Sequence, residues 1–277
     1  MLIQHPIGSV LVHLDGTVRA ELRWRLGMQI ARNFDAHLSA IFAVAPRYLP
    51  LVAIGGVPSM LPPPAIDPEH RQRALDILRR SSAPGRERGE WLEPGDDSVV
   101  RGVVRRAMTA DLVVLGQRDC RDAEAFDVPA DLVSSVVIES GRPTLVVPAE
   151  GPVSARPESI LVAWKPTPEA ARALTAALPF LRDAREIHLT EDAIDEIDIA
   201  PVGARDYLRW HGIEQVRAAR RLSRQDSGTD LLALANECGA QLIVLGCYGH
   251  SRARELVMGG VSRVLLEASP IPILTVH

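Results

Sequence analysis

The stretch that best indicates the fold is 241–277, QLIVLGCYGHSRARELVMGGVSRVLLEASPIPILTVH. The apolar run 242–245 has the length of a buried strand, and the amphipathic run 261–268 predicts a helix. The loop between them contains Gly246, Gly249, Gly259 and Gly260. Such an arrangement can hold a phosphate, because glycine lets the backbone approach an anion and the N–H groups at a helix start face it.

The same strand pattern occurs earlier in the chain. DLVVLG at 111–116 aligns with QLIVLG at 241–246, an offset of 130, and SVLV at 9–12 aligns with SILV at 159–162, an offset of 150. The first half is therefore longer by 150 − 130 = 20 residues between these strands. A proline-rich insertion at 46–68 supplies most of this excess. The repeat predicts two copies of one fold.

Strands are predicted at 9–14, 38–44, 91–92, 112–115, 144–147, 159–164, 186–190, 214–218, 242–245 and 271–276. Helices are predicted at 18–33, 67–88, 96–108, 129–139, 167–181, 201–211, 226–238 and 261–268. The segment that precedes the helix at 129–139 is expected to be a polar loop.

The length of 277 residues suits two domains, which we expect at 1–150 and 155–277. Strands and helices alternate in each, which predicts a parallel sheet with helices on both faces. The expected fold class is α/β, with two tandem, open, doubly wound, five-stranded parallel sheets that are Rossmann-like. Ligands of such sheets bind at the carboxyl ends of the strands near the switch point in strand order. This rule directs attention to Asp15, Gly116, Lys165 and Gly246.

The composition excludes several classes of function. Hydrophobic residues make up 47% and charged residues 24%, as in soluble globular proteins. The net charge is −4 and the basic residues are dispersed, so we expect no nucleic-acid or membrane partner. No apolar run approaches the roughly 20 residues that span a bilayer, and the N-terminal sequence lacks the pattern of a signal peptide. Three cysteines without a CxxC pair fit a reducing compartment, so a cytoplasmic location is expected.

Motifs that would indicate catalysis are missing from the sequence. We find no GxSxG elbow, HExxH pair, GKS or GKT loop, or metal-spaced His/Cys cluster. We therefore expect neither catalytic residues nor a metal site.

The glycine loop and the first strand together point to a family. Gly246, Gly249 and Gly259 have the spacing Gly-x2-Gly-x9-Gly, and the first strand ends in LDGT at 14–17. In these features the chain resembles the universal stress protein family, whose nucleotide-binding members carry Gly-x2-Gly-x9-Gly-Ser/Thr between the fourth strand and the fourth helix. The resemblance covers both halves, so the chain is similar to a tandem universal stress protein.

This resemblance implies a five-stranded parallel sheet in each domain and pairing of the two domains through their last strands, as a pseudo-dimer within one chain. A further homodimer is left open. It also implies ATP or another adenine nucleotide, bound without defined catalytic turnover, with its phosphates on the glycine loop and its base against the first two strands. The candidate binding residues are Trp164, Lys165, Gly246, Gly249, Gly259, Gly260 and Ser262.

The second half departs from the family pattern at two positions. Gly260 stands where the family has Ser or Thr, although the Ser262 hydroxyl could contact the phosphates or cap the helix. Lys165 replaces an acidic or amide residue that would contact the sugar and base. A lysine cannot accept a hydrogen bond. It could attract phosphates as a cation, and a solvated surface lysine fits the sequence equally well.

The first half has lost the glycine loop. Asp119 replaces the second glycine, and Ala130 and Asp131 replace the third glycine and its hydroxyl neighbour. Two carboxylates would repel a phosphate, so we expect no nucleotide in this half. Asp15 is expected to be a helix N-cap.

Three functions remain open at this point. The first is a stress-response protein that binds a nucleotide in its second half, the second is a nucleotide-free interaction scaffold, and the third is a weak ATP-hydrolysing enzyme. The insertion at 46–68 is apolar enough to form a lid, to contact a partner or to pack on its own domain.

Overall fold

A computed structural model describes residues 7–47, 65–80, 89–191, 203–221, 228–247 and 260–277. We call residues 1–150 the N-terminal half and residues 155–277 the C-terminal half. No helix among the described residues is both long and apolar enough to cross a membrane.

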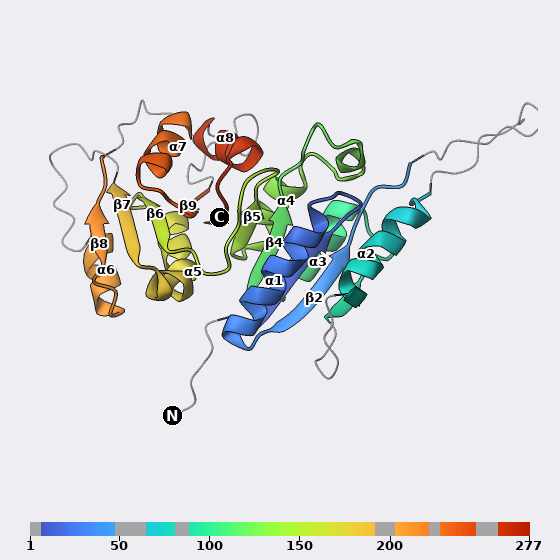
Figure 1. The fold of residues 1–277 in the computed structure, drawn as a ribbon, viewed down its shortest axis with the longest axis horizontal. Helices are drawn as coiled ribbons and strands as arrows, with labels where there is room; N and C mark the ends of the chain where they lie inside the picture. The colour runs from blue at the N-terminus through green and yellow to red at the C-terminus, as the bar shows by residue number, and fades with distance from the viewer. Residues whose placement is uncertain (1–6, 48–64, 81–88, 192–202, 222–227, 248–259) are drawn as a thin grey trace, which may run out of the picture.

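Within these described ranges, ten strands form one sheet in the order β3-β2-β1-β4-β5-β10-β9-β6-β7-β8 (Figure 1). Their bounds are β1 Ser9–Leu14, β2 His37–Phe42, β3 Glu90–Leu92, β4 Leu112–Gly116, β5 Thr144–Val147, β6 Ser159–Trp164, β7 Glu186–Glu191, β8 Val216–Ala218, β9 Leu242–Gly246 and β10 Ile273–Val276. Neighbouring strands are parallel, except that β10 is antiparallel to β5. The α/β class is confirmed, and the two five-stranded parallel halves are joined edge to edge in a single sheet.

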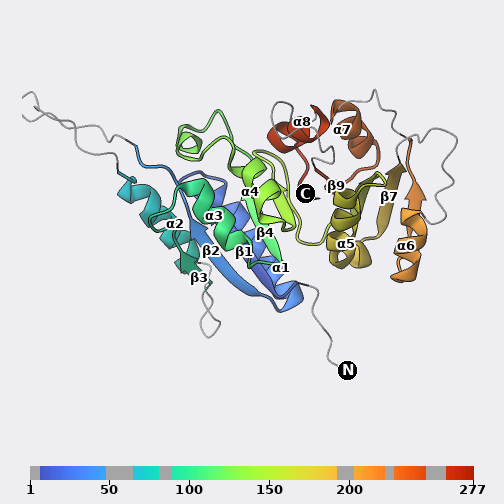
Figure 2. The ribbon, with the colours of Figure 1, turned by 180° about the vertical axis from the view of Figure 1, so that it is seen from behind.

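Eight α-helices lie on the two faces of this sheet among the described residues (Figures 1 and 2). Their bounds are α1 Ala20–Phe34, α2 Pro68–Arg80, α3 Val99–Ala107, α4 Leu132–Ser140, α5 Pro168–Asp183, α6 Ala204–Trp210, α7 Gly228–Glu237 and α8 Gly260–Ala268. The buried side chains of α1, α2, α5 and α6 share one apolar cluster with alternate strand residues, and α3, α4, α7 and α8 pack on the opposite face. Successive side chains of a strand point to opposite faces of the sheet. Val12 therefore belongs to the cluster on one face and Leu11 to the cluster on the other.

Local sequence signals set the ends of several helices. Thr167 caps α5, where its side chain accepts from the Ala170 amide at 3.3 Å, and Pro168 occupies the first turn. Asp35 ends α1 in the left-handed conformation with φ of 53°, and Gly141 does so after α4 with φ of 63°. These residues end α1 and α4, and the chain continues into β2 and β5.

The two halves share one apolar core at the β5–β10 junction. Leu145 lies opposite Leu274 in the antiparallel ladder, and each is the second residue of its half's last strand. Beside this junction, the rings of Phe34 and Phe180 meet edge to face with centroids 5.9 Å apart. One buried cluster therefore runs through both halves, and their last strands pair as the resemblance implied.

The predicted strands and helices are present where the structure describes them, with ends that differ by a few residues. The expected polar loop before α4 instead contains a 3-10 helix, η1, at Ala123–Asp127. Most of the insertion at 46–68 lies outside the described residues, and its flanks are held together by an isolated bridge between Arg47 and Ala65.

Candidate functional site

The C-terminal switch point comprises the carboxyl ends of β6 and β9 and the residues that follow them. β6 and β9 are parallel neighbours, with Ala163 paired to Leu245, so Trp164 and Gly246 end the two strands side by side. From here the chain continues to α5 on one face of the sheet and to α8 on the other. Ligands of open α/β sheets bind at this kind of position.

Two of the predicted residues lie at the end of β6. Trp164 is half-buried and packs against the main apolar cluster. Lys165 is exposed, and its carbonyl accepts from the Thr167 amide at 2.8 Å. Lys165 is also the single lysine of the whole sequence.

Gly246 has a packing role of its own. A Cβ atom added to it would lie 2.6 Å from the carbonyl carbon of Glu169 and closer still to the Ala170 amide nitrogen. The first turn of α5 therefore rests directly on the end of β9, and a side chain at this position would push it away. This contact explains Gly246 without any ligand.

The rest of the glycine loop is only partly described. Gly249 and Gly259 lie outside the described residues, whereas Gly260 begins α8 and Ser262 lies in its first turn. The half-buried Ser262 side chain hydrogen-bonds the Cys247 thiol, which also accepts from the Thr275 hydroxyl at 2.7 Å. Ser262 therefore already has a partner within the protein.

Sequence reasoning missed Glu169, an acidic residue in the first turn of α5. Its Oε1 lies 3.2 Å from Arg172 Nη2, and its side chain is 14% exposed. Oε2 is buried and has no partner with full hydrogen-bond geometry among the described residues. Burial by itself would raise the pKa of Glu169, but its own amide, Thr167, Arg172 and His277 outweigh that effect and hold the pKa below its ordinary value. The carboxylate is therefore ionised at neutral pH.

Arg172 also ties α5 to the end of the sheet. Its Nε donates to the His277 carbonyl at 3.0 Å. The N-terminal half has a similar contact, in which Arg19 Nη2 donates to the Pro148 carbonyl at 2.9 Å. In both halves an arginine near the start of the first helix holds the residue that follows the last strand.

The N-terminal switch point, at the carboxyl ends of β1 and β4, is filled by Arg23. This guanidinium reaches back from α1, lies 2.5 Å from Asp15 Oδ2 and donates to the His13 carbonyl at 3.2 Å. Arg23 is 2% exposed, and its Cδ would lie 3.0 Å from a Cβ atom added to Gly116. The side chain therefore bridges the two strand ends between which a ligand would lie.

Asp15 is not a helix N-cap, so that prediction is wrong. The N-cap position of α1 belongs to Arg19, which makes no side-chain capping bond. Asp15 instead accepts from the amide and hydroxyl of Thr17, at 2.9 and 2.6 Å, and faces Arg23. The buried cation draws the carboxylate inward, away from the helix start.

These buried groups have shifted pKa values. Burial would raise the pKa of Asp15, but Arg23, His13 and the bonds from Thr17 lower it below the ordinary value. Burial lowers the pKa of His13, and the charge of Arg23 acts in the same direction. His13 Nε2 lies 2.8 Å from the Ala43 carbonyl oxygen. At neutral pH the site therefore holds an ionised aspartate, a guanidinium and a neutral imidazole.

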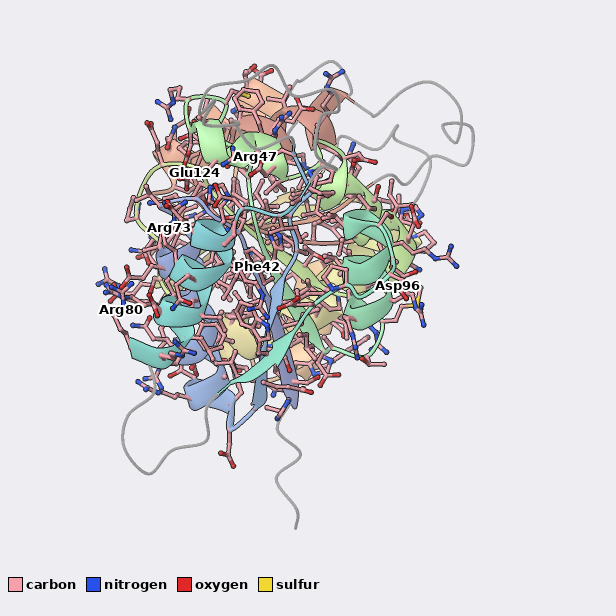
Figure 3. All side chains as sticks on the ribbon, turned by 90° about the vertical axis from the view of Figure 1, so that its right-hand side faces the viewer. Phe42, Arg47, Arg73, Arg80, Asp96 and Glu124 are labelled. Atoms are coloured by element: carbon pink, nitrogen blue, oxygen red, sulfur yellow. The ribbon has the colours of Figure 1, made fainter. Side chains whose placement is uncertain are left out.

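A second layer of polar and charged side chains covers this site. The His70 ring lies against Gly16, with its Nδ1 3.2 Å from Asp127 Oδ2 and its Nε2 3.2 Å from Arg47 Nη2. Arg73 reaches Glu124 of η1 at 2.5 Å. Figure 3 shows Arg47, Arg73 and Glu124 together at this end of α2. The N-terminal switch point is closed by the protein's own side chains.

The two carboxylates that were expected to repel a phosphate play smaller parts. Asp119 accepts from Arg121 at 3.1 Å, and Asp131 precedes α4 without a side-chain capping bond. Occupation by Arg23 is thus a more direct obstacle to a ligand than charge repulsion. Among the described residues, no group of His, Cys, Asp and Glu side chains could hold a metal ion.

Comparison with known proteins supports the α/β fold described above. The model of the Universal stress protein family matches residues 157–277. A universal stress protein from Archaeoglobus fulgidus DSM 4304 aligns with 98% of this chain and 97% of its own, with a TM-score of 0.64 and 16% identity. A putative universal stress protein from Pseudomonas aeruginosa UCBPP-PA14 aligns with 98% and 93%, with a TM-score of 0.60 and 15% identity.

A functionally unknown protein from Pseudomonas aeruginosa PAO1 aligns with 98% of this chain and 92% of its own, with a TM-score of 0.59 and 15% identity. No curated protein matches the sequence. The family match covers the C-terminal half, whereas the likeness in fold extends over both halves.

Proposed function

We propose that this chain is a universal stress protein-like, stress-response protein that binds ATP or a related adenine nucleotide at its C-terminal switch point, without catalytic turnover. The observation that carries the proposal is the contrast between the described side chains at the two switch points. Arg23 fills the N-terminal one, whereas its counterpart at the offset of 150 is Ala173, which has no group to reach across. The family match covers the half in which Ala173 takes the place of that arginine.

The C-terminal switch point offers groups suited to each part of a nucleotide. Trp164 provides an aromatic surface for a base, and the single lysine, Lys165, provides an exposed cation for phosphates. The start of α8 at Gly260 supplies backbone N–H groups and the positive end of the helix dipole. Gly249 and Gly259 would complete the phosphate loop.

Binding without turnover is the form of the proposal that agrees best with the chemistry of the site. Cys247 is the nucleophile nearest in sequence to Gly246, but it is buried and its thiol pKa is raised by burial. A protonated thiol is a poor nucleophile. Weak hydrolysis of ATP is the third function, and a measured turnover that Gly259→Val abolishes would establish it.

A nucleotide-free scaffold is the competing function. Two observations favour it. Lys165 stands where the family has an acidic or amide residue. The Ser262 hydroxyl already hydrogen-bonds Cys247 within the protein. The filled N-terminal switch point agrees with either function. A direct binding measurement separates the two.

The single lysine allows a test with one reporter group. The full-length protein is acetylated with an amine-reactive reagent, with or without millimolar ATP, and the modified peptides are quantified by mass spectrometry. We expect ATP to slow acetylation of Lys165 severalfold and to leave the N-terminal amine unaffected as an internal control. Calorimetry with ATP, ADP and AMP, together with mass spectrometry of small molecules released from the purified protein, identifies the nucleotide.

A Gly249→Val variant serves as the binding-deficient comparison. Equal acetylation rates with and without ATP, no calorimetric signal and no co-purified nucleotide would together reject the proposal and favour the scaffold.

A further inference from the structure

We infer that His70 is a pH sensor in the N-terminal half: its neutral ring binds the Arg47 guanidinium, and its protonated ring releases it. The inference does not depend on nucleotide binding. Histidine is the side chain whose ordinary titration falls between pH 5 and 8, and His70 lies among charged groups from three segments of the chain. These groups are Arg47 after β2, Asp67 before α2, Arg73 within α2, and Glu124 and Asp127 of η1.

The His70 ring is held in place among these groups. It is 2% exposed, and a Cβ atom added to Gly16 would lie 2.8 Å from its Cγ and Nδ1, so the ring rests on the backbone that follows β1. Ala74, one turn later on α2, is fully buried and keeps the helix on the apolar cluster. A change in the charge of the ring must therefore move its neighbours. Arg47 can move, because its side chain is 39% exposed.

The position of Arg47 determines which nitrogen of the neutral ring carries the proton. Arg47 Nη2 lies 3.2 Å from His70 Nε2, and a guanidinium has only donors, so Nε2 is the acceptor. The proton of the neutral ring is then on Nδ1, which faces Asp127 Oδ2 at 3.2 Å, a contact short of full hydrogen-bond geometry. A protonated ring has an N–H on both nitrogens. Nε2 would then direct a donor and a positive charge at Arg47, and the contact is lost.

Carboxylates are in place to replace Arg47 as the partner of the ring. Glu124 Oε1 lies 3.6 Å and Asp67 Oδ2 3.7 Å from His70 Nε2. The five charged groups named above comprise three carboxylates and two guanidiniums, so one positive charge on the ring balances them. Protonation therefore exchanges a guanidinium for a carboxylate at Nε2 and leaves the rest of the cluster in place.

The release of Arg47 affects the backbone beside it. Arg47 and Ala65 form the isolated bridge, in which the Arg47 amide donates to the Ala65 carbonyl at 3.0 Å and the Ala65 amide donates back at 2.9 Å. The Arg47 guanidinium joins the same two segments, since it contacts His70 on α2 and Asp67 two residues after Ala65. Loss of the contact with the ring removes one of these connections, so we expect the bridge to open more often at low pH.

Nuclear magnetic resonance on the full-length, ¹⁵N-labelled protein tests the inference between about pH 8 and about pH 5.5, the range in which histidine titrates. The His70 signals are assigned by comparison with His70→Gln. At the higher pH we expect the His70 proton on Nδ1, and at the lower pH a proton on both nitrogens. Exchange of the Arg47 and Ala65 amides, corrected for its intrinsic pH dependence, is expected to accelerate about tenfold at the lower pH, the equivalent of one hydrogen bond.

Two variants and a control separate the sensor from a merely structural role. In His70→Gln the corrected exchange rates should not change with pH. In Arg47→Ala, which keeps the ring, the neutral proton should move toward Nε2, where Glu124 can accept it. His37→Gln is the control, because His37 is an exposed histidine of the same half that faces Glu90 at 3.4 Å, and it should keep the wild-type response.

Thermal unfolding shows whether each variant is folded, and the wild-type spectra decide the question even if His70→Gln is not. Three results would overturn the inference. They are a neutral His70 ring with its proton on Nε2, a ring whose charge stays constant over the whole range, and an acceleration of exchange that survives in His70→Gln.

Discussion

The two switch points of this molecule occupy equivalent places in one fold and differ in the described groups that pack there. In the N-terminal half, Arg23 reaches from α1 to Asp15 and lies against Gly116, so charged side chains fill the position. In the C-terminal half, Ala173 takes the place of Arg23, and the backbone of α5 rests on Gly246. A glycine ends the fourth strand in both halves, but it accommodates a guanidinium in one and a helix start in the other.

This difference teaches that a glycine at a strand end does not by itself identify a ligand site. In each half the missing side chain makes room for part of the protein. The charge of the neighbouring residues distinguishes the two sites better. Asp15 is neutralised internally by Arg23, whereas Lys165 is exposed and Glu169 has a buried oxygen without a partner of full geometry among the described residues.

The largest expected effect comes from removing the internal cation. Arg23→Ala leaves Asp15 as a buried charge without its main partner, so we expect the free energy of unfolding to fall by about 3–5 kcal/mol. Urea denaturation monitored by circular dichroism measures the change. The control is Arg25→Ala, since Arg25 on the same helix pairs with Glu21 at the surface and such pairs contribute about 0–1 kcal/mol.

A similar small loss for Arg23→Ala and Arg25→Ala would contradict the view that the N-terminal switch point is held together by its internal ion pair. The double variant Arg23→Leu/Asp15→Leu sharpens the test. It removes both charges, and we expect it to be more stable than Arg23→Ala.

An intermediate effect is expected at the two glycines. Gly246→Ala places a methyl group against backbone atoms of Glu169 and Ala170, and Gly116→Ala places one against Arg23. Overpacking of this kind costs about 1–3 kcal/mol. In an Arg23→Ala background the cost of Gly116→Ala should largely disappear, while that of Gly246→Ala should persist. Denaturation of the three single and two double variants measures both couplings, and purely additive losses at Gly116 would contradict the packing.

The smallest effect concerns pH. His13 has a pKa below its ordinary value of 6.5 because it is buried. As the pH falls below 6.5, the unfolded chain binds a proton that the folded protein does not, so stability decreases toward the folded pKa by up to about 1.4 kcal/mol per pH unit. His13→Gln should have a shallower dependence between pH 7.5 and 5.5. Parallel stability curves for the variant and the wild type would show that His13 does not titrate on unfolding.

Much of the fold could be predicted from the sequence, because its signals are local. The apolar runs at β1, β4, β6 and β9 are long enough for strands, and the amphipathic spacing of α1 and α5 is regular. The offsets of 130 and 150 between the halves indicated the common order of elements. The single ten-stranded sheet followed less directly, because strand pairing at β5 and β10 depends on contacts across 129 residues, from Leu145 to Leu274.

The candidate sites were predicted less well. The glycine spacing pointed to Gly246 and the start of α8. Arg23, eight residues beyond Asp15, is one of several polar residues on its predicted helix, and the sequence does not distinguish it from the others. Only the direction of its side chain brings it to Asp15 and Gly116. Glu169 was overlooked for a similar reason, since an acidic residue in a first helical turn is common and its burial depends on α5 resting on β9.

The sequence by itself determined the α/β class, the order of elements in each half and the location of the glycine loop, because periodicity and glycine spacing act over short distances along the chain. Tertiary structure decided that Arg23 fills the N-terminal switch point, that Asp15 turns inward, and that Glu169 is buried at the start of α5. Those outcomes depend on side chains from different elements that meet at a strand end, where burial changes the energy of each charge according to its neighbours.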